Sequence, residues 1–208
     1  MRVITCEQRS PEWFAARCGL ITASRFKDAR AKLKNGAPAQ AQLDYMAELA
    51  LERITGSLAD RFVTPAMQRG AELESAARSA YEADTGELVT ELGICLHDTL
   101  GFGYSPDGLV GADGLIEIKC PATPYKLAQL LLTRDVSEYT DQVQGGLWIT
   151  GRAWCDVLIY HPSIPLKPLR LQRDDGYIDA LEADLLAFAV EVDAYTERLR
   201  KVAACRDC

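Results

Sequence analysis

Hydrophobic residues recur at two different spacings along this chain, and the spacing separates expected helices from expected strands. Apolar residues three or four positions apart indicate amphipathic helices, while apolar residues that alternate or form short runs between turn residues indicate strands. Helices are expected over residues 11–18, 22–33, 39–55, 65–84, 123–132, 139–150 and 175–202. Strands are expected over residues 87–97, 102–104, 115–120, 153–160 and 166–173. Helices that flank one mixed sheet give an α/β layer architecture.

The first two expected helices offer a place for an anion. Ser10-Pro11-Glu12 combines a capping side chain, a proline at the first helical position and an acid at the positive end of the helix dipole. Arg17 projects from this helix, and Thr22 or Ser24 lies near the start of the next, where free N–H groups favour an anion. A phosphate pocket is one interpretation. Physical reasoning alone favours the other, in which Thr22 caps its helix and Arg17 is solvated.

The stretch from Gly103 to Pro121 has the pattern of a hairpin, with turn residues at 111–114. Side chains alternate across a strand, so Glu117 and Lys119 share one face, and Ile116 and Ile118 share the other. The isoleucine face is expected in the core. The opposite face then presents a carboxylate and an ammonium side by side, with Asp107 on the neighbouring strand.

Asp107 and Glu117 would repel each other unless a positive charge lay between them, and a hard divalent cation with oxygen ligands, above all Mg²⁺, fits that place. A lysine beside it can orient or deprotonate an attacking water. Glu117-Ile118-Lys119 follows Pro-Asp-Gly at strand–turn–strand spacing and resembles the PD-(D/E)xK nuclease motif. The alternative is a surface hairpin with an ion pair, because ordinary residue usage produces about one acid-x-Lys triplet in such a chain.

A further carboxylate, Glu74, lies on the expected helix 65–84. Spacings of three and four place it on one helical face with small and aromatic residues and an arginine: Gly70, Ala77, Arg78 and Tyr81. A carboxylate on such a face is a candidate site residue. An ordinary Glu74–Arg78 helix pair is the alternative.

Charge is unevenly distributed along a chain with a net charge of −7. Residues 1–34 hold eight Lys or Arg against three acids, whereas residues 174–197 hold eight acids and no Lys or Arg. The net negative charge argues against a generic polyanion binder. A basic N-terminal face could confine DNA to one surface. The alternative, which charge alone favours, is that these charged helix faces are simply solvated. Seven scattered cysteines, the lack of an apolar leader and the lack of a long apolar run favour a reduced, cytoplasmic protein without a membrane anchor.

Several stretches in one order resemble the YqaJ-like viral recombinases, the family of the phage lambda exonuclease. These stretches are Glu7 to Trp13, Ala16 to Ser24, Gly70 to Arg78, Ser105 to Gly108 with Leu115 to Pro121, and Tyr139 to Trp148. The resemblance covers about residues 7–150, and the order of the motifs is more specific than any one of them. It implies a restriction-endonuclease-like fold and a single exonuclease domain over residues 1–208.

The resemblance also implies chemistry and partners. The expected activity is a Mg²⁺-dependent exonuclease, with Mn²⁺ as a possible substitute, that degrades the 5′-ended strand of duplex DNA and leaves a 3′ overhang for a single-strand annealing protein. The family forms ring-shaped homo-oligomers, often trimers, and works in the host cytoplasm as a phage or prophage protein. The site residues carried over are Asp107, Glu117 and Glu74 as metal ligands, Lys119 and Gln142 as catalytic partners, and Arg17, Thr22, Ser24 and Gln144 as phosphate or DNA contacts.

Two alternatives stay open. Another nuclease on the same fold, site-specific or CRISPR-associated, would share the motif, and an iron–sulfur version would use Cys205 and Cys208 with Cys6 or Cys18. A non-catalytic DNA-binding or assembly protein would carry a damaged metal site, whereas Asp107, Glu117 and Lys119 are all present here.

Overall fold

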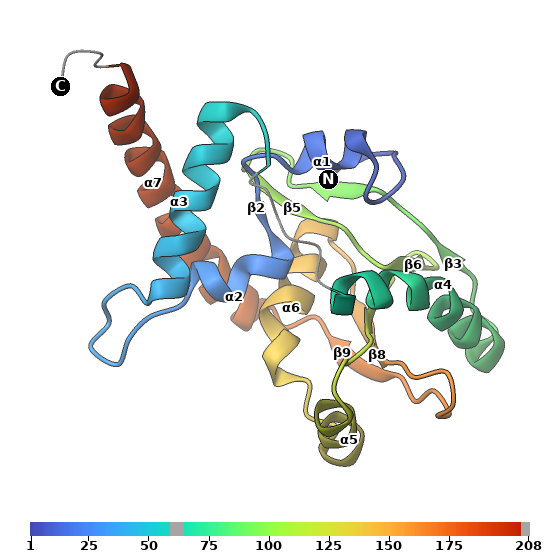
Figure 1. The fold of residues 1–208 in the computed structure, drawn as a ribbon. Helices are drawn as coiled ribbons and strands as arrows, with labels where there is room; N and C mark the ends of the chain where they lie inside the picture. The colour runs from blue at the N-terminus through green and yellow to red at the C-terminus, as the bar shows by residue number, and fades with distance from the viewer. Residues whose placement is uncertain (59–64, 205–208) are drawn as a thin grey trace.

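Two mixed β-sheets form the centre of the protein, and helices pack around them (Figure 1). The computed structural model describes residues 1–58 and 65–204. The four-stranded sheet has the order β1 (Arg2–Ile4), β4 (Ile94–Leu96), β5 (Phe102–Tyr104), β2 (Ile21–Thr22). The five-stranded sheet has the order β3 (Val89–Thr90), β6 (Gly108–Val110), β7 (Gly114–Lys119), β8 (Trp154–Ile159), β9 (Leu169–Gln172). The helices are α1 (Pro11–Arg17), α2 (Phe26–Ala29), α3 (Gln40–Thr55), α4 (Pro65–Thr85), α5 (Pro124–Thr133), α6 (Thr140–Thr150) and α7 (Asp175–Ala204), with short 3₁₀ turns η1 (Ala23–Arg25) and η2 (Ser137–Tyr139).

The predicted α/β class with helices around a mixed sheet is confirmed, although the strands form two mixed sheets and not one. The expectation of one continuous strand over residues 87–97 is wrong. The chain forms β3 and β4 there, and these strands belong to different sheets. Gly93 lies at the break, and a Cβ atom on it would come within 2.6 Å of the Ile4 carbonyl oxygen. The backbone of β1 therefore approaches too closely for a side chain, and the local apolar pattern does not record that approach.

The second expected helix, 22–33, is also shorter than predicted. Residues 21–22 form β2, which pairs in parallel with β5, and the helical part is reduced to η1 and the single turn of α2. The chain then turns back on itself, with an isolated bridge between Lys32 and Pro38. Arg30 anchors this exit through ion pairs to Asp141 and Asp184 from two other helices. Tertiary contacts thus override the helical spacing of the segment.

β7 is the middle strand of its sheet and is covered on both sides. It pairs in parallel with β8 along its whole length and antiparallel with β6 over Gly114–Ile116. Leu115 packs in the larger core with α3, α6 and α7, while Ile116 and Ile118 pack with Ala77 and Tyr81 of α4. The isoleucine face is in a core as predicted, but the opposite face is buried as well, so Glu117 is only 3% exposed.

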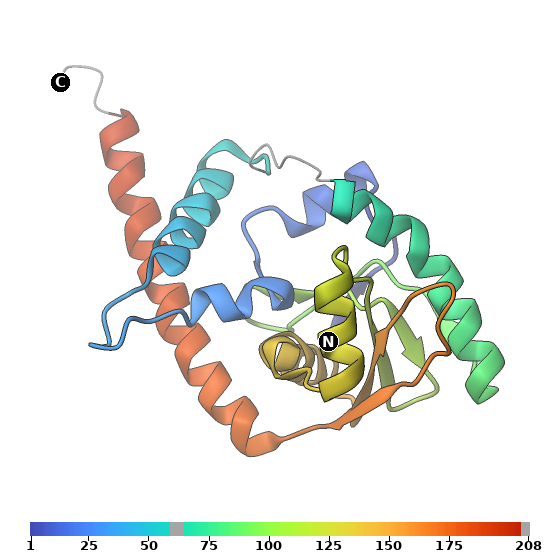
Figure 2. The ribbon, with the colours of Figure 1, turned by 60° about the horizontal axis from the view of Figure 1, so that its bottom comes forward.

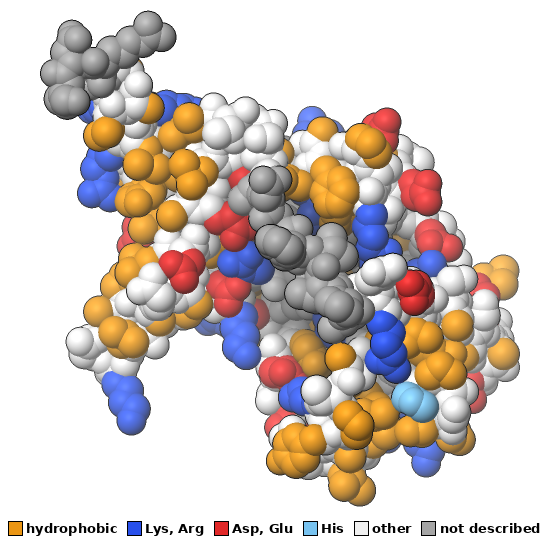
Figure 3. All heavy atoms as spheres, viewed as in Figure 1, with side chains coloured by type: hydrophobic (Ala, Val, Ile, Leu, Met, Phe, Trp, Pro, Cys, Tyr) orange, Lys and Arg blue, Asp and Glu red, His pale blue; other side chains and the backbone are white. Residues whose placement is uncertain are grey.

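The long helix α7 runs alongside α3 at one side of the molecule, as both ribbon views show (Figure 1 and Figure 2). Tyr45 of α3 and Phe188 of α7 stack with their ring centroids 5.7 Å apart. Acids of α7 pair with basic residues of the N-terminal half, as Asp184 does with Arg30 and Asp193 does with Arg53. The uneven charge along the chain is therefore partly cancelled in space, and Figure 3 shows basic and acidic side chains interspersed on one face.

Within residues 1–58 and 65–204, no helix is both long and apolar enough to cross a membrane.

Candidate active site

The β6–β7 hairpin brings the predicted carboxylates together. Asp107 lies immediately before β6, and its Oδ2 accepts a hydrogen bond of 2.6 Å from the backbone N–H of Ile118. Ile118 separates Glu117 from Lys119, so the Asp107 carboxylate is held against the part of β7 that carries both side chains. Strand alternation predicts this arrangement, and the hairpin register produces it.

Glu117 and Lys119 belong to a closed network of hydrogen bonds. Lys119 Nζ donates to Glu117 Oε1 at 2.8 Å and to the amide oxygen of Gln142 at 2.9 Å. Gln142 Nε2 donates to the same Glu117 oxygen at 2.6 Å. The second Glu117 oxygen accepts from the hydroxyl of Tyr104 at 3.0 Å, and Lys119 Nζ lies 4.7 Å from the ring centroid of Tyr139. Gln142 was expected from the family resemblance, whereas Tyr104 and Tyr139 were not identified from the sequence.

Burial alone acts in opposite directions on the pKa values of Asp107 and Lys119, but the pKa of each group is raised in the structure. Burial, together with the charge of Glu117, raises the pKa of Asp107 well above its usual range, although the Ile118 N–H opposes this rise. Burial alone would lower the pKa of Lys119, but the Glu117 carboxylate and its hydrogen bond outweigh burial, so the pKa is raised. Lys119 is therefore a firmly held ammonium in this state, and it acts as a donor.

Glu74 faces the same region from α4, where it pairs with an arginine other than the one sequence spacing indicates. Arg9 Nη2 lies 2.5 Å from Glu74 Oε1, while Arg78 pairs with Glu91 and donates to the backbone oxygen of Asp107. The simple Glu74–Arg78 helix pair is not the arrangement found. A polar cavity of about 310 Å³ is lined by Arg9, Glu74, Arg78, Glu91 and Asp107 among others.

The donor set is suited to a hard divalent cation, although its members do not converge as a finished metal centre. Among the described residues, no three His, Cys, Asp or Glu side chains are placed as ligands of one ion. The charges of both Glu117 and Glu74 nevertheless raise the pKa of Asp107, so each of these two carboxylates repels the Asp107 carboxylate. Carboxylate oxygens are the ligands that Mg²⁺ prefers, and such an ion would relieve this repulsion.

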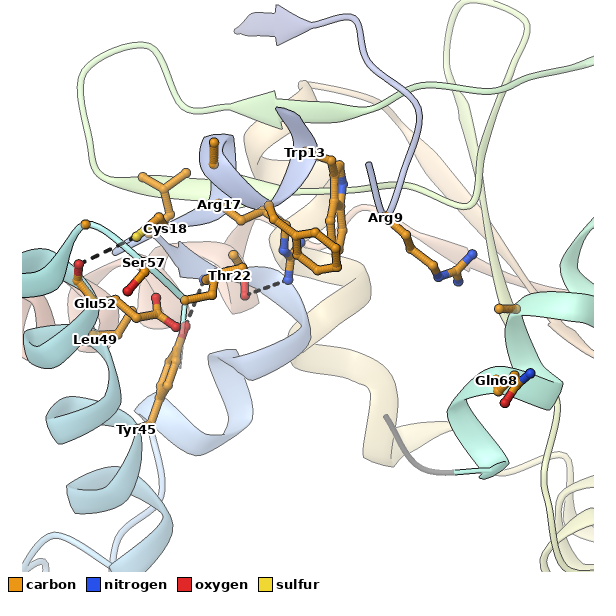
Figure 4. A pocket seen from close by; sticks show the side chains of 16 residues that line it. Arg9, Trp13, Arg17, Cys18, Thr22, Tyr45, Leu49, Glu52, Ser57 and Gln68 are labelled. Carbon is orange, nitrogen blue, oxygen red and sulfur yellow. Dashed lines mark hydrogen bonds between the residues drawn. The ribbon is translucent and has the colours of Figure 1, made fainter. Parts of the chain in front are cut away.

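A second subsite surrounds Arg17 (Figure 4). Its guanidinium donates to Ser105 Oγ at 3.2 Å and to Thr22 Oγ1 at 3.4 Å, and it lies 4.2 Å from the centroid of the Trp13 ring. Ser24 Oγ lies 3.5 Å from Thr22 Oγ1, and Trp13 Nε1 donates to Ser105 at 2.9 Å. The predicted cluster of Arg17, Thr22 and Ser24 is thus brought together, at the edge of a cavity of about 680 Å³ that Arg17 and Thr22 help to line.

Two details of this subsite differ from the sequence-based expectation. The backbone N–H of Thr22 donates to the Tyr45 hydroxyl at 3.0 Å, and the Thr22 side chain caps no helix. The helix start is a three-residue 3₁₀ turn, so side chains and not a helix dipole dominate here. The sequence indicates Ser105 only as part of the Ser-Pro-Asp-Gly motif, because its contact with Arg17, 88 positions earlier in the chain, leaves no local pattern.

Gln144 lines neither of these two cavities, and its contact with DNA stays a prediction. Its side chain is buried, with Nε2 donating to the Gln172 carbonyl and Oε1 accepting from the Asp174 N–H. Through these two hydrogen bonds, the amide nitrogen and oxygen of Gln144 join α6 to the end of β9 and to the residue before α7. Cys205 and Cys208, which the iron–sulfur alternative requires, lie outside the described residues.

Known proteins share both the sequence pattern and this fold. Residues 12–153 match the YqaJ-like viral recombinase domain. Two solved structures of an alkaline exonuclease (LHK-Exo) from Laribacter hongkongensis, one in complex with dAMP, are each 44% identical to this chain, with TM-scores of 0.84 and 0.85 over 94% of this chain and 98% of theirs. A phage related exonuclease from Haemophilus somnus 129PT shares the fold at 16% identity, with a TM-score of 0.69 over 86% of this chain and 96% of its own. A search of curated proteins finds no match.

The fold, the carboxylate–lysine site and these similarities define the class of the protein as a deoxyribonuclease. The chain belongs to the YqaJ-like viral recombinase family, and its exonuclease activity is of the phage type. The family resemblance inferred from the motifs is therefore confirmed.

Proposed function

We propose that this protein is a divalent-cation-dependent exonuclease that degrades one strand of duplex DNA from a 5′-phosphorylated end and leaves a 3′ overhang. One observation carries the proposal: Ser105, which contacts Arg17, is two residues from Asp107 in the same short segment. Arg17, which is suited to a terminal phosphate, is thereby held close to Asp107, which is suited to bond cleavage, through the short segment that carries both Ser105 and Asp107. Such a spacing suits removal of nucleotides from an end.

Each residue has a distinct role in this proposal. Arg17 binds the terminal phosphate with the hydroxyls of Thr22, Ser24 and Ser105, because a guanidinium forks onto two phosphate oxygens and hydroxyls can donate to others. A terminal phosphate carries a charge that an internal phosphodiester lacks, so this cluster favours ends. The dAMP bound to the Laribacter exonuclease supports a site for a single deoxynucleoside monophosphate.

The cation would be held by Asp107, Glu117 and Glu74, with Mg²⁺ as the expected ion and Mn²⁺ as a possible substitute. When bound, it would supply Lewis-acid stabilisation of phosphate charge and acidify water at the site. Lys119, held charged by Glu117 and oriented by Gln142, donates toward the scissile phosphate or the attacking water. Its proposed role is to position the attacking water and to stabilise negative charge, since its ammonium donates to both Glu117 and Gln142.

The wider setting follows from the family. We infer a single-strand annealing protein as the partner that takes the exposed 3′ strand, and a ring-shaped homo-oligomer, a trimer by analogy, as the working form. The expected place of action is the cytoplasm of a bacterial host that carries the phage or prophage.

Four DNA substrates test this function. Linear duplexes with 5′-phosphate or 5′-hydroxyl ends, a duplex phosphorylated on one strand only, and a closed circle are incubated with Mg²⁺ or with EDTA. The expected result is Mg²⁺-dependent release of mononucleotides from the phosphorylated strand, with slower action on hydroxyl ends and none on circles. Rapid cutting of closed circles would support the endonuclease alternative, and DNA binding without any cleavage would support the assembly-protein alternative.

A further inference from the structure

Arg9 lies between the two subsites and belongs to neither of the roles assigned above. Together with Ala71 it lines both cavities, the larger one beside Arg17 and Thr22 and the smaller one beside Glu74 and Asp107. Figure 4 shows Arg9 between Trp13 and α4, with its side chain directed toward α4. A DNA strand that runs from the terminal-phosphate cluster to the catalytic carboxylates would therefore pass this side chain.

The backbone of Arg9 is fixed, whereas its side chain is not enclosed. Arg9 adopts a left-handed conformation with φ 70°, which is uncommon for a residue other than glycine. Its neighbours hold it there: Gln8 Nε2 donates to the carbonyls of Leu92 and Pro106, and Ser10 caps α1. The Arg9 side chain is 48% exposed, so it can change rotamer. Its backbone position is fixed, because the adjacent Gln8 is hydrogen-bonded to Pro106, the residue before Asp107.

The partner of Arg9 in this structure is a residue that a cation would also need. Arg9 Nη2 pairs with Glu74 Oε1 at 2.5 Å, and the charge of Glu74 is one of those that raise the pKa of Asp107. The Arg9 side chain is 48% exposed and that of Glu74 is 19% exposed, and a partly exposed ion pair is weak enough for a divalent cation held by several carboxylates to displace it. Arg9 and the cation compete for Glu74 because two positive charges against one carboxylate repel each other.

We propose that Arg9 alternates between two partners: Glu74 when the carboxylates hold no cation, and a backbone phosphate of the bound DNA strand when a cation engages Glu74. This inference rests on the proposed function, because it needs DNA to enter the site. The released guanidinium binds, in forked geometry, the scissile phosphate, which is the first phosphate after the 5′-terminal one when a mononucleotide is released. Without a cation, Arg9 thereby neutralises the charge of Glu74. When a cation binds, Arg9 becomes free to bind DNA, so cation binding and DNA affinity are coupled.

Replacement of Arg9 by alanine should change two affinities in opposite directions. Without DNA, the variant loses a competitor for Glu74, so Mn²⁺ should bind more tightly, by up to about five-fold, the equivalent of a partly exposed ion pair. With DNA and Ca²⁺ in place of Mg²⁺, binding of a 5′-phosphorylated hairpin duplex should weaken about ten-fold, the size of one charged hydrogen bond. The slope of log affinity against log salt should fall by about 0.9, one phosphate contact.

The Mn²⁺ measurement follows free ion by electron paramagnetic resonance, and the DNA measurement follows fluorescence anisotropy at several salt concentrations. Arg9→Lys should keep the salt slope. Arg200→Ala removes an arginine of similar exposure that is paired with Glu197 on α7, and it should change neither affinity. In a Glu74→Gln background, Arg9→Ala should no longer affect Mn²⁺ binding.

A purely structural Arg9 that only holds Glu74 in place predicts the reverse: Mn²⁺ binding by Arg9→Ala would weaken, and this result would overturn the proposal. An unchanged salt slope with unchanged DNA affinity would overturn the phosphate contact. A wild-type protein that neither binds nor cuts the duplex would instead reject the proposed function, while the Mn²⁺ measurement, which uses no DNA, would still report the competition for Glu74.

Discussion

Gln142 Nε2 lies 2.6 Å from Glu117 Oε1, the same oxygen that accepts a hydrogen bond from Lys119. Because the Gln142 amide oxygen also accepts from Lys119, the three side chains form a closed ring between α6 and β7. The strand places Glu117 and Lys119 on one face, but the helix decides how the ammonium is directed. The position of the catalytic lysine is therefore a property of two elements packed together.

Gln142→Leu should lower turnover on linear duplex about 10- to 100-fold with little change in DNA affinity, because it removes an orienting contact and keeps the volume. Adding Gln142→Leu to Lys119→Ala should cost little more than Lys119→Ala alone, since both changes act on one ammonium. Single-turnover rates and anisotropy binding of all three variants provide the cycle. Fully additive losses would mean that Gln142 acts on the substrate independently of Lys119.

Lys119→Ala should reduce turnover by about 10²–10⁴-fold, while DNA affinity changes much less. A group that stabilises charge in the transition state contributes little to ground-state binding. Rates and binding constants on the same 5′-phosphorylated duplex separate the two effects. Normal turnover with weakened binding would make Lys119 a phosphate contact, and the reaction would then need another residue in its place.

Asp107→Asn should abolish cleavage and, in EDTA, raise the thermal stability of the protein. The pKa of Asp107 is raised in the folded state, so between the usual value of about 4 and the raised one the folded state holds a proton that the unfolded state has lost. The wild type therefore loses stability as the pH rises between these two pKa values. The Asp107→Asn variant shows no such loss, because its amide side chain does not titrate. Melting temperatures in EDTA from about pH 4 upward should show the difference between variant and wild type growing with pH.

Two results would contradict this account of Asp107. Wild-type-like cleavage by Asp107→Asn, or full activity of the wild type in EDTA, would remove Asp107 from the active site. A melting temperature for Asp107→Asn that stays below that of the wild type at every pH would show that the carboxylate stabilises the fold. Addition of Mg²⁺ should stabilise the wild type more than the variant, because the ion binds the folded carboxylates.

Arg17→Ala should slow degradation of 5′-phosphorylated linear duplex about 10- to 100-fold, in keeping with the loss of a charged hydrogen bond of ~1.5–3 kcal/mol. It should matter much less on 5′-hydroxyl ends, where the partner charge is absent. Initial rates of mononucleotide release on the two substrates make the comparison, and each variant is its own control. Equal losses on both ends would reject the role of Arg17 in sensing the terminal phosphate.

The carboxylate–lysine hairpin could be predicted from the chain because it is a local structure. Strand alternation, the turn at residues 111–114 and the spacing of Asp107 to Glu117 depend on neighbours within about fifteen positions. The same holds for α1, whose cap, proline and acid stand next to one another, and for the long helix α7, whose apolar stripe marks one side of the helix. Physical rules that act over a few residues determine these parts.

Only the packed structure decided which distant side chains complete the site. The Arg17–Ser105 and Arg9–Glu74 contacts join residues 88 and 65 positions apart, and the burial of Gln144 depends on where β9 and α7 meet α6. The division of residues 87–97 between two sheets also depends on the close approach of β1 to Gly93. Sequence periodicity shows which face of an element is apolar, but the partner of that face is chosen by packing of the whole chain, which no local spacing records.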